Sequence, residues 1–151
     1  MIKKVLLLLM LAMSCQLMQA QSATEKIFKK YESMSEGILT VEATGQEMAQ
    51  LTKDDKEKAV MKKVDKIRIL HTATKKIAAS MEADFKSLEG DGFTSLTNDK
   101  GQTLMVKYGT DKATITEAVF YNTAAKGTSL AFVSGKLNKE EVKVLSLGRF
   151  M

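Results

Sequence analysis

The sequence predicts an α+β fold in which a mostly antiparallel, mixed sheet of about six strands packs against helices on one face. Two patterns support this prediction. Apolar residues recur at helical spacing near both ends and in the middle of the chain, whereas the second half alternates between apolar and polar residues in short stretches. Glycine, asparagine and aspartate separate those stretches, and proline is absent. The expected order is α-β-β-α-β-β-β-β-α.

The amino terminus has the plan of a secretory signal. Lys3 and Lys4 precede an apolar run from Val5 to Met13, and a more polar segment ends at Ala20. A helix needs roughly 20 apolar residues to span a bilayer, so this run is too short for a transmembrane anchor. We expect residues 1–20 to act in export and residues 21–151 to form a single domain in the periplasm or cell envelope.

Two modes of processing are compatible with this terminus. A signal peptidase that cuts after Ala20 releases a soluble exported protein, although Met18 is bulkier than the usual small residue at its position. Alternatively, Cys15 is lipidated and anchors the protein to the outer or inner membrane. Ser14 fits a lipoprotein signal, whereas Ala12 and Met13 fit it poorly. We expect membrane contact only in this second case.

Composition excludes several classes of chemistry. Cys15 is the single cysteine, so the mature chain has no thiol for a disulfide, a thiol nucleophile or a cysteine-metal site. Removing residues 1–20 removes Lys3 and Lys4 but no acid, and the formal net charge falls from +5 to +3. Lysines and acids are interspersed, as in residues 53–58, so we expect no nucleic acid among the partners.

The first elements are predicted from capping signals. Ser22 and Glu25 form a capping-box pattern at the start of a helix over residues 23–35, which ends before Gly37. Residues 38–43 alternate as a half-buried strand, and Thr44 with Glu47 then predicts a short helical turn. The charged stretch 52–58 is expected to be a loop or an exposed helical end, and residues 67–71 a second strand.

The clearest helix follows the second strand and is expected to stop at Gly90. Its apolar stripe comprises Ile77, Ala78, Met81, Phe85 and Leu88. We expect this stripe to lie across the sheet and to meet the strand residues around Leu104, Val106, Ile115 and Val119.

Four strands and a final helix complete the prediction. The strands are expected at residues 93–97, 103–108, 113–121 and 128–134, and the helix starts from a cap at Asn138. Glu117 is the discordant residue of the third of these strands, between Ile115 and Val119. Either it lies at a rim that water reaches, or the strand contains a bulge between Ile115 and Val119.

Four motifs of these elements occur together in one known family. They are Ile27-Phe28 with Tyr31, the segment Val64 to Leu70, the hairpins from Phe93 to Tyr121, and the segment Val133 to Asn138. With these motifs the chain resembles a family of small exported Bacteroidetes envelope proteins known as domain of unknown function 4252. The resemblance spans residues 24–147 and is moderately specific only as a set of motifs. It implies an envelope location and an α+β fold, and it brings no substrate, cofactor or active-site residue.

Catalytic chemistry has little support in the sequence. His71 is the only histidine, and the chain has no nucleophile elbow, glycine-rich phosphate loop or second histidine to complete a triad or a zinc site. We therefore assign no catalytic, cofactor-binding or metal-binding residue. The better indication of function is a group of aromatic residues on neighbouring strands: Tyr108, Phe120 and Tyr121, with Phe132 nearby. Phe120 and Tyr121 must point to opposite faces, so we expect one to face away from the helix-covered core.

Two functions follow as hypotheses. The first is a non-enzymatic envelope domain that binds a protein or an envelope ligand through the exposed sheet face. The alternative is a small periplasmic hydrolase or isomerase that uses carboxylates or His71, which requires an acid buried beside His71 or beside another acid. The sequence predicts neither the ligand nor the oligomeric state.

Overall fold

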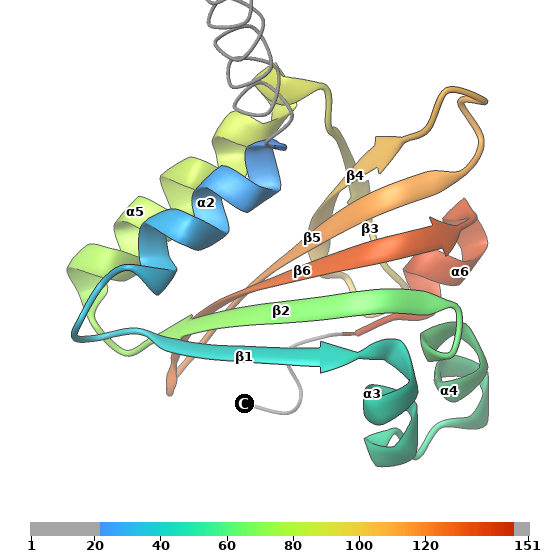
Figure 1. Ribbon diagram of the computed structural model, residues 1–151, viewed down its shortest axis with the longest axis horizontal. Helices are drawn as coiled ribbons and strands as arrows, with labels where there is room; N and C mark the ends of the chain where they lie inside the picture. The colour runs from blue at the N-terminus through green and yellow to red at the C-terminus, as the bar shows by residue number, and fades with distance from the viewer. Residues whose placement is uncertain (1–21, 147–151) are drawn as a thin grey trace, which may run out of the picture.

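A computed structural model describes residues 22–146 and contains one six-stranded sheet with the strand order β1-β2-β6-β5-β4-β3 (Figure 1). Every pair of neighbouring strands is antiparallel, which confirms the α+β class and the expected number of strands. The strands are β1 (Leu39–Thr44), β2 (Val64–Thr72), β3 (Thr94–Thr97), β4 (Thr103–Tyr108), β5 (Ile115–Ala124) and β6 (Gly127–Leu137).

Helices cover both faces of this sheet. The helices α2 (Ala23–Glu32) and α5 (Lys75–Ser87) lie side by side on one face, whereas α3 (Gly45–Leu51), α4 (Asp55–Met61) and α6 (Lys139–Val144) pack against the other (Figure 1). The expectation of helices on one face is therefore wrong. The reason that helices cover both faces is visible in β5, where Val119 and Phe120 point to opposite faces and both are buried. A strand that is apolar on both sides needs cover on both sides.

The two layers form separate apolar clusters. Under α2 and α5, the sheet contributes Leu70, Met105, Val119, Leu130 and Phe132. Under α3, α4 and α6, it contributes Val64, Ile67, Ile69, Leu104, Val106, Ile115, Ala118, Phe120, Ala131, Val133 and Leu137. The register explains this division, because residues paired across strands share a face.

The contacts of the α5 stripe differ in part from the prediction. Met81, Phe85 and Leu88 are buried against the sheet, and Ile77 is half-buried at the edge of the same cluster. Val119 is among their partners, but Leu104, Val106 and Ile115 face the opposite helices. Ile115 and Val119 lie on different faces because the strand is irregular between Ile115 and Glu117.

The segment between β1 and β2 contains more helix than expected. The sequence predicts a loop or a helical end for residues 52–58, but the helix α4 begins at Asp55. Asp54 caps this helix, because its side chain accepts a hydrogen bond of 2.9 Å from the backbone N–H of Glu57. The far end of α4 buries Val60 and Met61. The observed order thus has two short helices, α3 and α4, between the first two strands.

Two further features differ from the sequence prediction: the exposure of β1 and the end of α5. The edge strand β1 was expected to be half-buried, but the side chains of Leu39 and Val41 remain 56% and 40% exposed. The long helix α5 continues into a 3₁₀ turn, η1 (Leu88–Asp91), and the chain reverses at Gly92 rather than at Gly90. Gly92 has a φ angle of +88°, the left-handed conformation that favours glycine.

Two irregularities in strand pairing shape one end of the α2 face. The β2–β6 register shifts between Val64 and Lys66, and the β5–β6 register shifts between Ile115 and Glu117. As a result, Ser134 of β6 pairs with Lys66 on one side and with Glu117 on the other. A polar row of Lys66, Ser134 and Glu117 therefore crosses β2, β6 and β5 on the α2 face.

Candidate functional site

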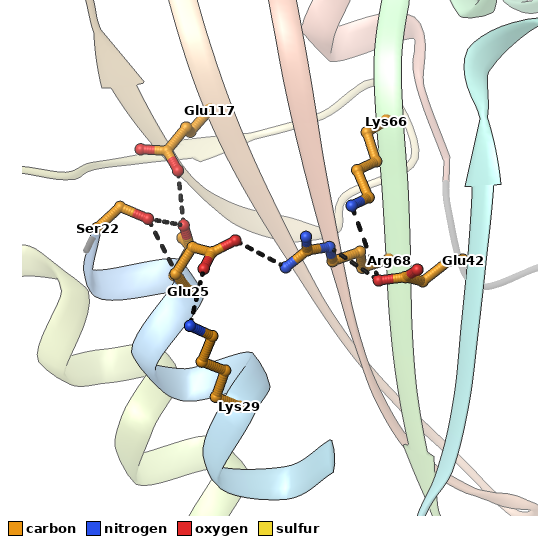
Figure 2. Close-up of polar contacts among 8 residues, drawn as sticks. Ser22, Glu25, Lys29, Glu42, Lys66, Arg68 and Glu117 are labelled. Carbon is orange, nitrogen blue, oxygen red and sulfur yellow. Dashed lines mark hydrogen bonds and ion pairs between the residues drawn. The ribbon is translucent and has the colours of Figure 1, made fainter. Parts of the chain in front are cut away.

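A pocket of about 160 Å³ lies between the start of α2 and the sheet. Its walls come from the start of α2 and from β2, β5 and β6, so residues of three separate parts of the chain meet there (Figure 2). The lining residues are Ser22, Thr24, Glu25, Phe28, Lys66, Arg68, Glu117, Ala118, Phe132, Val133 and Ser134.

The floor of the pocket has a polar part and an apolar part. The polar part is the row of Lys66, Ser134 and Glu117. Two residues further along the strands, the ring of Phe132 meets the ring of Phe28 edge to face, with centroids 6.1 Å apart. Because α2 begins at Ala23, its apolar side chains cover the Phe132 end of the face and leave the polar row at the pocket.

Glu117 forms the acidic wall. Thr24, the second residue of α2, donates a hydrogen bond from Oγ1 to Oε1 of Glu117 over 2.6 Å. The hydroxyl of Ser22 lies 3.0 Å from the same Thr24 oxygen. Within residues 22–146, no basic side chain lies within ion-pair distance of Glu117. Its cross-strand neighbour Lys107 instead places its ammonium 5.7 Å from the centre of the Phe93 ring.

Arg68 is the fixed cation of the opposite wall. Its Nη1 lies 3.0 Å from Oε1 of Glu25 (Figure 2). Its guanidinium carbon lies 4.8 Å from the centre of the Phe28 ring. Its Nε lies 3.1 Å from Glu42, but that buried N–H forms no well-directed hydrogen bond with any of residues 22–146. The contact with Glu42 is therefore an ion pair without a hydrogen bond. Arginine stacked on an aromatic ring and held by carboxylates keeps its planar donors in one orientation.

Lys66 is the less constrained cation. Its ammonium lies 3.8 Å from Glu42, and 45% of its side chain is exposed. An exposed ion pair at this distance contributes little, between about 0 and 1 kcal/mol. Lys66 is thus able to exchange Glu42 for another acidic partner at small cost. The four charged lining residues, Glu25, Glu117, Lys66 and Arg68, have formal charges that cancel.

The aromatic residues proposed from sequence do not share one surface. Phe120 is buried under α3, α4 and α6, and Tyr108 packs at the edge of the same cluster. Tyr121 faces the other side, where its ring stacks on Phe85 with centroids 5.4 Å apart. Burial raises the pKa of Tyr121. Because helices cover both faces, neither Phe120 nor Tyr121 is the outward aromatic that the sequence suggested.

His71 lies on the α3 face, away from the pocket. Its Nδ1 is 2.8 Å from the hydroxyl of Ser129, the residue paired with it on β6. His71 is half-buried and Ser129 is buried. Among residues 22–146, no acidic side chain forms a hydrogen bond or ion pair with His71, and no group of three or more potential ligands is arranged to hold a metal ion.

A further polar cluster joins the two helices of the α2 face. The Tyr31 hydroxyl donates to Asp84 and lies 2.8 Å from the hydroxyl of Ser80, and Lys30 pairs with Asp84 at 2.9 Å. Burial and the hydrogen bond to Asp84 raise the pKa of Tyr31, and the hydrogen bond to Asp84 raises the pKa of Lys30. A raised pKa keeps both groups protonated at neutral pH, so both donate hydrogen bonds that link α2 to α5.

Sequence reasoning identified parts of the pocket without joining them. The Ser22–Glu25 cap and the discordant Glu117 were both noted, whereas Arg68 and Ser134 were read only as strand residues. The available signal for Arg68 was its position between Ile67 and Ile69, as a charged residue inside an apolar strand. The expected signal segment and the proposed lipidation residue Cys15 lie outside the described residues. Within the described part of the chain, no helix is long and apolar enough to cross a membrane.

These features define a class of α+β protein: an antiparallel six-stranded sheet, covered on both faces, with a small charge-lined pocket at one end of the α2 face. The chain belongs to the family described as "Domain of unknown function (DUF4252)", whose model matches residues 31–145. The resemblance stated from the sequence is confirmed. No curated protein and no solved structure matches the chain.

Proposed function

We propose that the protein is an exported, non-enzymatic domain of the cell envelope that binds a ligand in the pocket beside α2. One observation carries this proposal: four charged side chains line the pocket, and one of them, Glu117, lacks a cationic partner within residues 22–146. Charged groups taken out of water are costly unless they are paired. A ligand with a cationic group that pairs with Glu117 offsets this cost, and this is the physical reason to keep such a pocket.

The proposal changes the location of the binding surface. The sequence pointed to an exposed sheet face with Tyr108, Phe120 and Tyr121, but these side chains are engaged in the two clusters. The pocket lies on the α2 face and is formed by the first turn of α2 together with three strands.

Export remains part of the proposal and rests on the signal-like plan of residues 1–20. Mass analysis of the amino terminus of protein extracted from the envelope tests it. A terminus at Gln21 indicates a soluble exported protein, and an acylated Cys15 indicates a lipid-anchored one. An intact Met1 in protein recovered only from the cytoplasm would contradict export.

The binding function is tested by filling the pocket. Ser134 lies at the centre of the polar row, so Ser134→Phe fills the space without adding a charge. Thermal unfolding is measured with a panel of small charged metabolites, and Ser95→Phe, at an exposed position of β3, serves as the matched control. A ligand at one hundred times its Kd stabilises the folded state by about 2.7 kcal/mol.

We expect at least one compound to raise the Tm of the wild-type protein and of Ser95→Phe but not that of Ser134→Phe. If no compound gives a stabilisation that depends on Ser134, the pocket is not a binding site for this class of ligand and the proposal is wrong. Circular dichroism of the unliganded variants verifies that each remains folded.

The alternative, a small hydrolase or isomerase, is favoured by one contact, the 2.8 Å approach of His71 Nδ1 to the Ser129 hydroxyl. A histidine beside a serine is the start of a nucleophilic pair, although a third group that orients the histidine usually completes it. A screen of ester and amide substrates tests this alternative. Turnover that His71→Gln and Ser129→Ala both abolish would establish the enzyme and displace the binding proposal.

A further inference from the structure

We infer that the pocket recognises a small zwitterion that carries an ammonium and a carboxylate, as a free α-amino acid does. This inference rests on the proposed binding function and adds the chemical class of the ligand. It follows from the arrangement of charges on the walls, from the placement of Glu117 and Lys66 on either side of Ser134, and from the size of the pocket.

The arrangement of charges assigns each end of the ligand. On β5, Glu117 accepts a hydrogen bond from Thr24 and retains acceptor capacity for an ammonium group. On β2, the acidic partner of Lys66 within residues 22–146 is the distant Glu42, so its ammonium is available to a carboxylate. A simple anion would leave Glu117 without a cation, and a simple cation would gain nothing from Lys66. A zwitterion satisfies both walls and leaves the pocket neutral.

The placement of the two charged side chains favours a small zwitterion. Glu117 and Lys66 are both paired with Ser134, so one strand, β6, separates their strands. Both side chains line the pocket, so a small ligand above Ser134 lies between a carboxylate on one side and an ammonium on the other. Lys66 contacts such a ligand by turning its flexible side chain away from Glu42 on β1.

The remaining lining limits the rest of the ligand. At about 160 Å³ the pocket is smaller than the roughly 300–1,000 Å³ of typical drug-sized sites, so it excludes a peptide of several residues. The rings of Phe28 and Phe132 close the end away from Ser134. Arg68 is held by Glu25 and by the Phe28 ring and therefore forms part of the wall. A short apolar side chain fits against these rings.

Calorimetry with matched compounds tests the inference. Alanine, serine and valine are each compared with the N-acetyl derivative, which lacks the ammonium, and with the amide, which lacks the carboxylate. All titrations use the full chain at pH 7 and constant ionic strength. We expect at least one free amino acid to bind tenfold or more tightly than both of its derivatives.

Two substitutions test separately which charged group of the ligand binds to Glu117 and which binds to Lys66. Glu117→Gln should weaken binding of the free amino acid at least tenfold and leave the N-acetyl derivative unchanged. Lys66→Gln should weaken the free amino acid similarly and leave the amide unchanged. Lys139→Gln, at an exposed position of α6, is the matched control and should alter neither affinity. Thermal unfolding of each variant verifies folding.

The outcomes separate this inference from the binding function. If a compound with a single charge binds in a manner that depends on Ser134, and the free amino acid binds no more tightly, the zwitterion assignment is wrong and the binding function stands. If Glu117→Gln leaves amino-acid affinity unchanged, the assignment is also overturned. If none of these compounds, nor any other in the wider panel, binds in a way that Ser134→Phe removes, both proposals fail.

Cleavage after Ala20 provides one further control. It would place a new α-ammonium on Gln21, directly before the pocket residue Ser22. Acetylating that terminus in the processed protein should leave amino-acid affinity unchanged. A tenfold rise in affinity after acetylation would show that the chain's own ammonium competes for Glu117, and it would overturn the assignment of a ligand ammonium to that residue.

Discussion

Thr24 Oγ1 donates a hydrogen bond of 2.6 Å to Oε1 of Glu117, a residue 93 positions later in the chain. The bond joins the first turn of α2 to the irregular part of β5. Thr24 is buried, so the bond forms largely away from water and fixes the direction of the Glu117 carboxylate in the pocket. A hydrogen bond to a charged group contributes about 1.5–3 kcal/mol.

Thr24→Val tests this link, because valine keeps the shape of threonine and removes the hydroxyl. We expect the free energy of unfolding to fall by about 1–2 kcal/mol, since Glu117 is half-buried and water partly replaces the lost donor. Urea denaturation measures the change. Thr94→Val, at an exposed position of β3, is the control and should change stability by less than about 0.5 kcal/mol. Equal effects of the two substitutions would contradict the proposed link.

The contact between Tyr31 and Asp84 predicts that the free energy of unfolding depends on pH in the alkaline range. Burial and the hydrogen bond to Asp84 raise the folded-state pKa of Tyr31 above its ordinary value of 10.0. A raised pKa gives stability that is complete below the unfolded-state pKa and is lost as the pH rises towards the folded-state value. We therefore expect the wild-type protein to lose stability above about pH 10.

Tyr31→Phe removes this contribution and should cost about 1–2 kcal/mol at pH 7, because Asp84 keeps Lys30 as a partner. The difference in unfolding free energy between wild type and variant should shrink as the pH rises above 10. Denaturation at pH 7, 9 and 10.5 measures both effects. A difference that stays constant over this range would mean that the Tyr31 hydroxyl is not coupled to folding.

Local signals in the sequence predicted the helix starts well. The side chains of Ser22, Thr44 and Asn138 each accept a hydrogen bond from the backbone N–H three residues later, as the capping patterns indicated. Such contacts lie within one turn of the chain, so no information from distant residues is needed. Asp54 caps α4 in the same way, and it was missed because the charged run around it resembles a solvated loop.

Non-local pairing explains what the sequence did not predict. The pocket depends on Ser134 being placed between Lys66 and Glu117, and that placement requires two register shifts in strands far apart in sequence. The sequence offered a bulge or a rim for Glu117, and the structure has an irregularity next to it and a polar pocket around it. The alternation of apolar and polar residues does not reveal the order of strands in a sheet. It therefore could not show that helices cover both faces of β5.

Two glycines, one at the start of α3 and one in the 3₁₀ turn η1, should respond oppositely to substitution by alanine. A Cβ on Gly45, at the start of α3, would lie 2.1 Å from the carbonyl oxygen of Val64 and 2.4 Å from that of Met61. These are backbone atoms, so the helix must shift, and overpacking of this kind costs about 1–3 kcal/mol. We expect Gly45→Ala to lower the free energy of unfolding by that amount.

Gly90→Ala is the matched substitution. Among residues 22–146, no atom outside the local turn lies within 4 Å of a Cβ at Gly90, and the backbone of Gly90 is outside the left-handed region. Alanine should therefore stabilise the protein by about 0.4–1 kcal/mol, because it restricts the unfolded chain. Thermal and urea denaturation compare both variants with the wild type. A Gly45→Ala protein as stable as wild type would contradict the close approach of α3 to β2.

The stripe of α5 gives the largest expected effect on stability. Phe85 is 5% exposed, and its ring stacks on Tyr121 of β5 at an interplanar angle of 22°. Met81 and Leu88 lie in the same cluster, so truncating Phe85 opens a cavity between α5 and the sheet. Phe→Ala substitutions in a core cost about 3–5 kcal/mol, a large share of the roughly 5–15 kcal/mol by which a domain is stable.

Phe85→Ala is therefore expected to lower the free energy of unfolding by about 3–5 kcal/mol in urea denaturation. Lys86→Ala is the matched control on the same helix, because its side chain is 71% exposed and pairs only with Glu82 within residues 22–146. It should change stability by less than about 0.5 kcal/mol. If the Phe85→Ala protein does not fold, Phe85→Leu keeps most of the volume and should lose a smaller part of the stability. A loss under about 1 kcal/mol for Phe85→Ala would mean that α5 does not pack against β5 through this ring.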